Sequence, residues 1–425
     1  MADDIRDKII TFRSMMGAAT AHEAAVDKAA AQKAKLLGGP WQQAAIMARI
    51  GNALQAMEDS EQQDGGPNVL TSPQDELASR MQASLADYGR GFTPLGPGGE
   101  ELKFDTITDP FGWAWSWLSD WSDDHHDIVR PASDDPEPIK NDLHIALLSD
   151  WGTGLYGAPV IASTVSGRCD DFDIIMHLGD VYYAGATKEM QQRFLDTWPK
   201  CPSIINRALN GNHEMYSGGF AYFDTTLKTF NQKSSYFAWQ NDNWLLVALD
   251  TACQDFDLDP TQVKWLERLI AKAGARRVMV FSHHQLYSQL DSQGPNLAEK
   301  LGSLLYDKAI HFWYWGHEHR CVLYDVHPSY NLVARCIGHG GMPQRRGSEK
   351  NAPVDSQMGD AIWRTLPAKK GIAPSAVILD GRNTCIKGEE DTYSPHGYVT
   401  LQFSGTKLHE KYFLPDGTLV READL

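Results

Sequence analysis

Five short segments of this 425-residue chain place side chains that can bind metal ions directly after apolar runs. They contain aspartate, asparagine or histidine, in most cases beside a glycine. The five are LSDWG at 148–152, GDVYY at 179–183, GNHE at 211–214, VFSHH at 280–284 and GHEH at 316–319. Any one segment has an ordinary explanation, such as a helix-capping or turn aspartate, a plain turn, or a buried histidine. Five in one chain favour a single metal site.

The residue types suit a pair of metal ions. His317 and His319 alternate along an extended segment, so their side chains point the same way. A carboxylate such as Asp180 can bridge two cations a few ångströms apart. Amide and imidazole ligands suit a divalent ion, whereas a phenolate suits a harder, trivalent one. Such a pair activates a bound water near neutral pH and holds a phosphoryl group during in-line attack, so no side-chain nucleophile is required.

Strands must position these residues. Short apolar runs lie at 145–148, 174–176, 204–205, 245–249 and 278–281, and a helical pattern covers 261–275. This alternation predicts a largely parallel, layered α/β fold, in which ligand sites lie at the carboxyl ends of the strands. The tail from 398 to 420 alternates apolar and polar residues and contains the turn Pro415-Asp416-Gly417, so it predicts an antiparallel ending.

In these motifs the chain resembles the calcineurin-like metallophosphoesterase superfamily and, within it, the purple acid phosphatase branch. The resemblance covers about residues 143–405 and rests on DxG, GDxxY, GNHE, VxxH and GHxH. It implies a β-sandwich flanked by helices, here with an N-terminal α-helical extension, and hydrolysis of phosphate monoesters by a metal-bound hydroxide. The wider superfamily usually has DxH at the first motif. Here Gly152 replaces that histidine and Tyr183 complements it, which favours the purple acid branch.

The resemblance implies two ligand sets. The first metal, Fe(III) in that branch, would be held by Asp150, Asp180, Tyr183 and His319. The second, which is Fe(II), Zn(II) or Mn(II) in relatives, would be held by Asp180, Asn212, His283 and His317. Asp180 would therefore bridge the two ions.

Three further side chains flank these ligands. His213 would donate a hydrogen bond to the phosphate or act as general acid for the leaving group. His284 would turn toward the substrate or pack, and Tyr182 would face away from the site and pack. Arg345 and Arg346 could hold a second phosphate or acidic group, although a solvated loop is the plainer interpretation.

Composition narrows the function classes. The formal charge of −16 disfavours a long nucleic acid or an anionic membrane as partner. It does not exclude the small phosphorylated substrate that the resemblance implies, because metal ions can supply the positive charge locally. We find no membrane-spanning run and no secretory signal at the amino terminus. The six cysteines show neither a CxxC pair nor disulfide-dense spacing, so a reduced, cytoplasmic protein is expected.

Three regions are expected along the chain: an α-helical region at 1–90, a Gly/Pro- and Trp-rich connector at 91–140, and a catalytic domain at 141–425. Helices are predicted over 3–37, from Trp41 to about Glu61, and from Ser72 to about Tyr88. They could mediate oligomerisation or partner docking, or form a structural appendage.

Two alternatives remain open. The same metals could serve a phosphodiesterase or nucleotide pyrophosphatase. In a different class, the chain could be a partner-binding scaffold with vestigial activity, although seven intact ligands argue against this.

Overall fold

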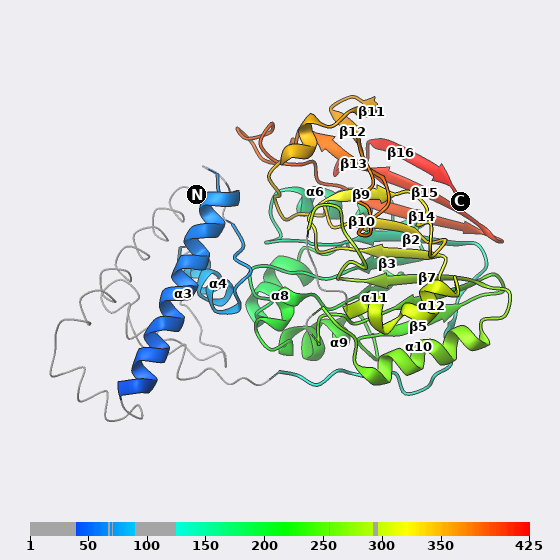
Figure 1. The fold of residues 1–425 in the computed structure, drawn as a ribbon, viewed down its shortest axis with the longest axis horizontal. Coiled ribbons are helices and arrows are strands. Elements are labelled where there is room, and N and C mark those ends of the chain that lie inside the picture. Colours follow the sequence, from blue (N-terminus) through cyan, green and yellow to red (C-terminus); the bar gives the residue numbers. More distant parts are fainter. Residues whose placement is uncertain (1–39, 67–68, 70, 90–124, 255, 292–295) are drawn as a thin grey trace. The chain divides into compact units, whose positions relative to one another are not determined.

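The computed structural model describes residues 40–66, 69, 71–89, 125–254, 256–291 and 296–425 (Figure 1). The chain divides into two compact units, one of residues 1–124 with 216–218 and the other of 125–215 with 219–425. The predicted helix over 3–37 and most of the Trp-rich connector lie outside the described residues. The three-region division and docking through the N-terminal helices stay predictions.

Two helices make up most of the described part of the first unit. These are α3 (Pro40–Asp64) and α4 (Glu76–Gly89). Ala53 and Met57 are buried one helical turn apart on α3. Asp75 caps α4, because its Oδ1 accepts a hydrogen bond from the amide of Ala78 at 2.8 Å. Among the described helices, none combines the length and the apolar character that crossing a bilayer requires.

The second unit contains a six-stranded sheet in the order β16-β15-β14-β2-β3-β4. Its parallel half comprises β2 (Leu143–Leu148), β3 (Ile174–His177) and β4 (Ile205–Ala208). Its antiparallel half comprises β14 (Tyr398–Ser404), β15 (Lys407–Phe413) and β16 (Leu419–Asp424). The antiparallel ending predicted from the alternating tail is therefore confirmed.

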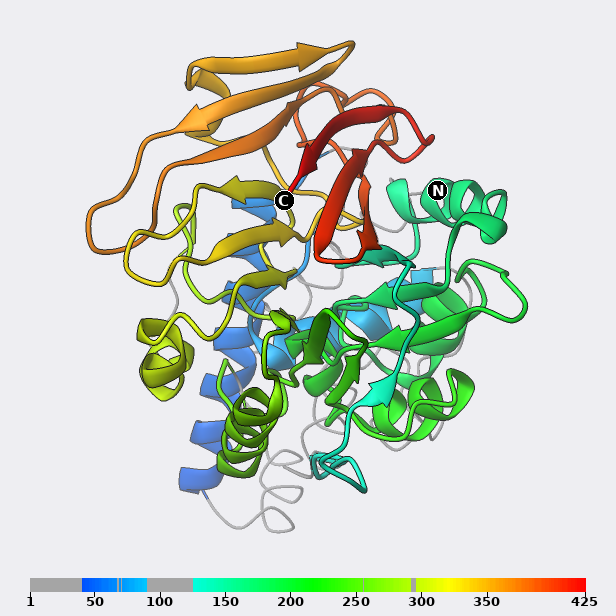
Figure 2. The same ribbon diagram turned by 90° about the vertical axis from the view of Figure 1, so that its right-hand side faces the viewer.

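A ten-stranded sheet runs in the order β1-β5-β6-β7-β8-β10-β9-β13-β12-β11. Its members are β1 (Glu137–Pro138), β5 (Phe237–Gln240), β6 (Trp244–Ala248), β7 (Arg277–Ser282), β8 (Phe312–Trp315), β9 (Cys321–Tyr324), β10 (Val333–Ile337), β11 (Val354–Met358), β12 (Ala361–Leu366) and β13 (Ala376–Gly381). Strands β6, β7, β8 and β10 are parallel to one another, whereas β5 and β9 on either side of them are antiparallel to β6 and β10. In Figure 2 this sheet runs from the orange strands at the top to the green strands below. The strands that precede the motifs are thus all paired in parallel with a neighbour, and both sheets are mixed.

Helices cover the outer faces of the two sheets. The α-helices of this unit are α6 (Gly157–Ser166), α7 (Thr187–Glu189), α8 (Asn212–Met215), α9 (Leu227–Thr229), α10 (Pro260–Lys272), α11 (Asn296–Lys300) and α12 (Gly302–Tyr306). Short helical turns lie at η1 (Cys169–Asp171), η2 (Met190–Leu195), η3 (Tyr222–Thr226) and η4 (Ser348–Asn351). Asp259 and Pro260 begin α10, because the Asp259 carboxylate accepts from the amide of Thr261 and proline fits the first helical turn.

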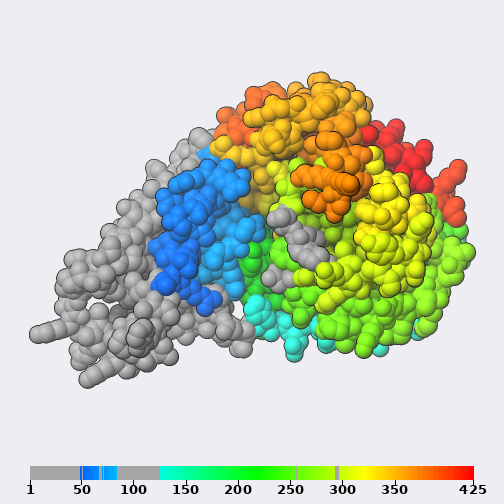
Figure 3. Space-filling model, in the orientation of Figure 1, coloured from blue at the N-terminus to red at the C-terminus, as the bar shows by residue number. Residues whose placement is uncertain are grey.

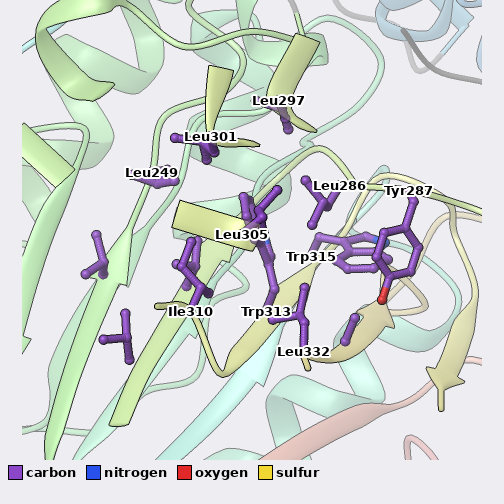
Figure 4. Packing of buried hydrophobic residues seen from close by; sticks show 14 of the residues in the cluster. Leu249, Leu286, Tyr287, Leu297, Leu301, Leu305, Ile310, Trp313, Trp315 and Leu332 are labelled. Atoms are coloured by element: carbon purple, nitrogen blue, oxygen red, sulfur yellow. The ribbon is translucent and has the colours of Figure 1, made fainter. Parts of the chain in front are cut away.

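The core has three parts, which follow from the two-residue period of the strands. Ile145 and Leu147 of β2 face the ten-stranded sheet, whereas Ala146 and Leu148 face α6 and η2. On the outer side of the large sheet, α10, α11 and α12 pack against β6, β7 and β8 through a cluster that includes Leu305 and Trp313 (Figure 4). The second unit is therefore a β-sandwich flanked by helices, as predicted.

One sequence-based expectation about the cysteines is wrong. Cys169 of η1 and Cys201, which precedes β4, form a disulfide with Cα atoms 5.3 Å apart. The fold brings them together because β3 and β4 are parallel neighbours, so the segments that lead into them lie side by side. A disulfide is typical of oxidising compartments. The predicted cytoplasmic location stays a prediction and loses this support.

Candidate metal centre

The predicted ligands follow parallel strands of both sheets. Asp150, Asp180 and Asn212 come shortly after β2, β3 and β4, and His283 and His317 come shortly after β7 and β8. Backbone hydrogen bonds join these ends, from Asp150 N to Gly179 O at 2.9 Å and from Gly316 N to His283 O at 3.0 Å. The two sheets therefore bring the carboxyl ends of these strands, and the segments after them, to one place.

Asp150 is fully buried and lies against the segment that follows β8. Its two carboxylate oxygens accept from the amide of His317 at 2.9 and 3.1 Å, and Oδ2 accepts from the hydroxyl of Ser149 at 2.5 Å. His319 Nε2 lies 3.6 Å from Asp150 Oδ1. Asp150, Asp180 and His319 place one ligand atom each within 4.8 Å of one another.

Asp180 lies between the two halves of the site. Its Oδ1 accepts from the amide of His213 at 3.1 Å and lies 3.3 Å from His283 Nε2. Its amide donates to the carboxylate of Glu214 at 3.1 Å. One carboxylate thus touches the groups predicted for the second metal and, through the cluster with Asp150 and His319, those predicted for the first.

The other half is built from amide and imidazole groups. Asn212 Oδ1 lies 3.0 Å from both His283 Nε2 and His317 Nδ1. His283 Nδ1 lies 2.9 Å from the carbonyl of Leu178, so it carries the proton and donates it to that oxygen. Once the second proton is displaced, the lone pair of His283 is on Nε2, which is the arrangement of a metal-ligating histidine.

The structure places Tyr182, and not Tyr183, with its hydroxyl in this cluster. That hydroxyl donates to Asp180 Oδ2 at 2.7 Å and is hydrogen-bonded to His319 Nε2. The Tyr183 ring instead lies 5.7 Å from the guanidinium carbon of Arg193. The expectation that Tyr182 faces away and packs is therefore wrong. Sequence spacing could not distinguish two adjacent tyrosines on a turn, because the turn's backbone decides which of them points inward.

His213 and His284 also border the cluster, where they were predicted to contact substrate. The His213 ring lies against that of Tyr182, with centroids 3.9 Å apart, and its Nδ1 donates to the carbonyl of Tyr183. His284 Nδ1 lies 3.1 Å from the carbonyl of Thr251, which makes Nδ1 the protonated nitrogen. His284 Nε2 is buried, finds no hydrogen-bond partner among the described residues and groups with His283 and His317 within 4.8 Å.

Glycines make room for the carboxylates. A Cβ at Gly211 would collide with the Asp180 carboxylate, and one at Gly316 with the Asp150 carboxylate. A Cβ at Gly338, after β10, would also come too close to the Asp150 carboxylate, at 2.8 Å from Oδ2. The glycines in the GNHE and GHEH segments are thus required by close approach, which explains why they accompany the ligand residues.

Burial and mutual charge set the protonation of the cluster. Burial raises the pKa of Asp150 to about 8. Burial would also raise the pKa of Asp180, but the charge of His283 and of its other histidine neighbours holds that pKa well below its usual range. Burial would lower the pKa of His283, yet the Asp180 carboxylate raises it to about 9. Burial lowers the pKa of His319 to about 3.

These groups fit a pair of metal ions. The carboxylates and imidazoles are buried together, and His284 aims a lone pair into the cluster without a partner among the described residues. Cations there would take the place of the protons that Asp150 and His283 hold. One group of candidate ligand atoms contains Asp150, Asp180 and His319 of the first expected set. The other contains His283 and His317 of the second set together with His284, which was expected at the substrate. The assignment of ligands to two metal ions stays a prediction.

Two acidic residues in the motifs were given no role by the sequence. Glu214 accepts from the amides of Gly211 and Asp180, at 2.9 and 3.1 Å, so it holds two of the loops together. Glu318 accepts from the indole of Trp315 at 2.9 Å and from the hydroxyl of Ser288. In the sequence, the only indication of these roles was the position of the two residues inside the GNHE and GHEH segments. Arg346, weighed as a phosphate ligand or part of a solvated loop, instead pairs with Asp380.

Comparison with known proteins gives a partial match. Residues 143–321 match the family model described as calcineurin-like phosphoesterase. A search of curated proteins found no match. Among solved structures, purple acid phosphatase PPD1 of yellow lupin (Lupinus luteus) is 14% identical at a TM-score of 0.49, covering 69% of this chain and 55% of that protein. GAP50, the anchor in the inner membrane complex of Plasmodium, is also 14% identical, at a TM-score of 0.47, covering 67% and 89%. The alignment with the lupin enzyme thus spans little more than half of that enzyme's length.

Proposed function

Because this chain contains a calcineurin-like phosphoesterase domain at residues 143–321, we propose that it hydrolyses phosphate monoesters at the candidate metal centre. The observation that carries the proposal is the buried cluster in which Asp180 lies between one group with Asp150 and His319 and another with His283 and His317. Two bound metal ions, in our proposal Fe(III) with a divalent Fe, Zn or Mn ion, would supply an activated water and neutralise charge on the phosphoryl oxygens.

The chain's own residues have distinct roles in this proposal. Asp180 would contribute to both metal sites, Asp150 and His319 would hold the first ion, and Asn212, His283 and His317 would hold the second. A tyrosine phenolate would complete the first set. The sequence resemblance assigns it to Tyr183, whereas the hydroxyl contacts support Tyr182. Phenolate ligation favours a trivalent ion.

His213 and His284 face the substrate in this proposal. His213 Nδ1 donates to the carbonyl of Tyr183, which orients the ring against Tyr182 at the border of the cluster. We propose that His213 binds the phosphoryl group or protonates the leaving oxygen. His284, held by Thr251 through Nδ1, lies beside the proposed substrate position.

Hydrolysis of p-nitrophenyl phosphate tests the proposal, with bis-p-nitrophenyl phosphate as the diester. We expect metal-dependent turnover of the monoester, abolished by chelation. Asp180→Ala should lower kcat/KM by at least about 100-fold and reduce the metal content. Asp224→Ala, which alters a solvent-exposed aspartate paired with Lys228, is the matched control and should keep both.

Two results would contradict the proposal. If Asp180→Ala retained wild-type turnover and metal content, the cluster would not be the active site. If the diester were the better substrate, the enzyme would be a phosphodiesterase on the same metals.

A further inference from the structure

A cavity with a volume of about 960 Å³ lies apart from the candidate ligands. Four segments border it: residues 286–291 after β7, the α11–α12 region, residues 327–330 after β9, and residues 368–374 between β12 and β13. Figure 3 shows this face, with the 368–374 turn in orange above the yellow residues around 300–330. None of the candidate metal ligands lines it. It is therefore a separate feature of the molecule.

Aromatic rings form one side of this cavity. The rings of His327 and Tyr330 are stacked, with centroids 4.0 Å apart and an interplanar angle of 10°. Tyr306, which is 65% exposed, meets Tyr330 edge-on at 5.2 Å, and Tyr287 lies 5.3 Å from His327. Burial lowers the pKa of His327, so its ring is neutral at physiological pH and offers an uncharged planar face. These surfaces suit a planar aromatic ring.

A buried tyrosine lies in the wall of the cavity. Tyr287 is 7% exposed, and its ring packs against Trp315 (Figure 4). Its hydroxyl is enclosed by protein, so Tyr287 contributes an aromatic surface to the wall and no hydrogen-bonding group.

Lysines stand at the mouth of the cavity. Lys369 and Lys370 belong to the exposed turn at its border, opposite a single lining carboxylate, that of Asp291. In a chain of formal charge −16, this is a local excess of positive charge. An anionic group would be attracted to this edge. A lysine near an aromatic ring also favours a ligand that has both an aromatic ring and a negatively charged group.

Cross-links between two of the walls show that the cavity is built into the fold. The Lys369 ammonium donates to the carbonyl of Gln289, and the buried Gln289 side chain donates to the carbonyl of Pro374. The 286–291 segment and the 368–374 turn are thus joined twice. The geometry is therefore fixed before any ligand arrives, which lowers the entropic cost of binding.

We propose that this cavity binds a small molecule with a planar aromatic ring and a negatively charged group. The ring lies against Tyr306 and Tyr330, and Lys370 faces the charge. Nucleotides and aryl phosphates or carboxylates share this chemistry. The inference does not depend on the proposed hydrolase activity.

Calorimetry with three probes tests it on the full-length protein. The probes are 1-naphthalenesulfonate, which has ring and charge and no phosphoester, 1-naphthalenemethanol, which has the ring alone, and sulfate, which has charge alone. We expect one site for the sulfonate, with binding at least about tenfold tighter than for either other probe. Equal affinity for the sulfonate and sulfate would overturn the proposal.

Variants locate the site. Tyr330→Ala and Lys370→Glu should each weaken sulfonate binding about tenfold, and Tyr306→Ala repeats the ring test at an exposed position where folding is not at risk. Lys272→Glu, the same charge change at an exposed position of α10, is the matched control and should bind normally. Asp180→Ala should also bind normally. Wild-type affinity in the three cavity variants, or loss in Asp180→Ala, would refute the cavity as the site.

Discussion

At the scale of single residues, the structure and the sequence differ on which tyrosine places its hydroxyl in the candidate metal centre. Tyr182 and Tyr183 are adjacent, and only the Tyr182 hydroxyl is in contact with Asp180 and His319. We therefore expect Tyr182→Phe to abolish the visible tyrosinate-to-iron absorption of the iron-loaded protein, whereas Tyr183→Phe keeps it.

The matched pair of variants makes this test decisive, because each removes one hydroxyl from neighbouring positions. Absorption spectra should be recorded with iron content measured on the same samples. Loss of colour in Tyr183→Phe, with colour retained in Tyr182→Phe, would restore the assignment made from the sequence.

Two buried histidines away from the ligands predict how stability depends on pH. Burial lowers the pKa of His339 to about 4 and that of His396 to about 3. Below the ordinary pKa near 6.5, the unfolded chain takes up a proton at each histidine and the folded protein does not. The free energy of unfolding should therefore fall by about 1.4 kcal/mol per pH unit per histidine as pH falls from about 6.5 to 4.

Urea unfolding of wild type and His396→Asn at pH 7 and pH 5 measures this effect. The variant should lose less stability between the two pH values than the wild type does, even if it is less stable at pH 7. His125→Asn, at an exposed position, is the control. An unchanged loss in His396→Asn would show that this imidazole does not stay neutral in the folded protein.

At the scale of elements, the sequence predicted strands and their carboxyl ends better than it predicted turns. The runs at 145–148 and 278–281 became β2 and β7 because a buried strand needs consecutive apolar residues. The ligand residues could then be predicted because they come shortly after the ends of these strands. The direction of Tyr182 could not be predicted, because it depends on the conformation of one loop.

The disulfide is a second element-scale feature that spacing alone did not indicate. Cys169 and Cys201 are 32 residues apart and meet only because η1 and the segment before β4 lie together. Closing a loop of this length should stabilise the protein by roughly 3–4 kcal/mol. Cys201→Ser should lower the free energy of unfolding by about that amount.

Thiol titration of the denatured protein checks the pairing itself. Without reductant we expect four reactive thiols, those of the unpaired cysteines Cys253, Cys321, Cys336 and Cys385. With reductant the number should rise to all six cysteines of the chain. Six thiols without reductant would mean that the pair is reduced in the isolated protein, in accord with the original expectation from the sequence.

At the scale of the second unit, the site exists because two sheets are held in register. Strand β2, early in this unit, pairs with β14 near the carboxyl terminus as well as with β3. Such pairing between distant segments leaves no local trace in the sequence. Residues 338–393, which matched no expected motif, supply β11 to β13 at one edge of the large sheet and, at Gly338, the backbone beside Asp150.

A buried ion pair joins the two sheets. Arg335 of β10 donates through Nε to both carboxylate oxygens of Glu410 in β15, at 3.2 Å each, and Tyr314 of β8 donates to the same carboxylate. Arg335 also donates to the carbonyl of Tyr324 at 2.9 Å. Glu410 is fully buried and Arg335 is 6% exposed, so either charge alone would be left in the core without a counterion.

Removing one partner should therefore cost more than removing both. We expect Glu410→Leu to lower the free energy of unfolding by about 3–5 kcal/mol, because the guanidinium stays buried without its carboxylate. The double variant Arg335→Met with Glu410→Leu should recover much of that loss, since it leaves no buried charge. Urea unfolding of the wild type, the two single variants and the double variant gives the free energies of unfolding for a double-mutant cycle. Additive losses would mean that the two charges are not coupled, and that apolar packing alone holds the sheets together here.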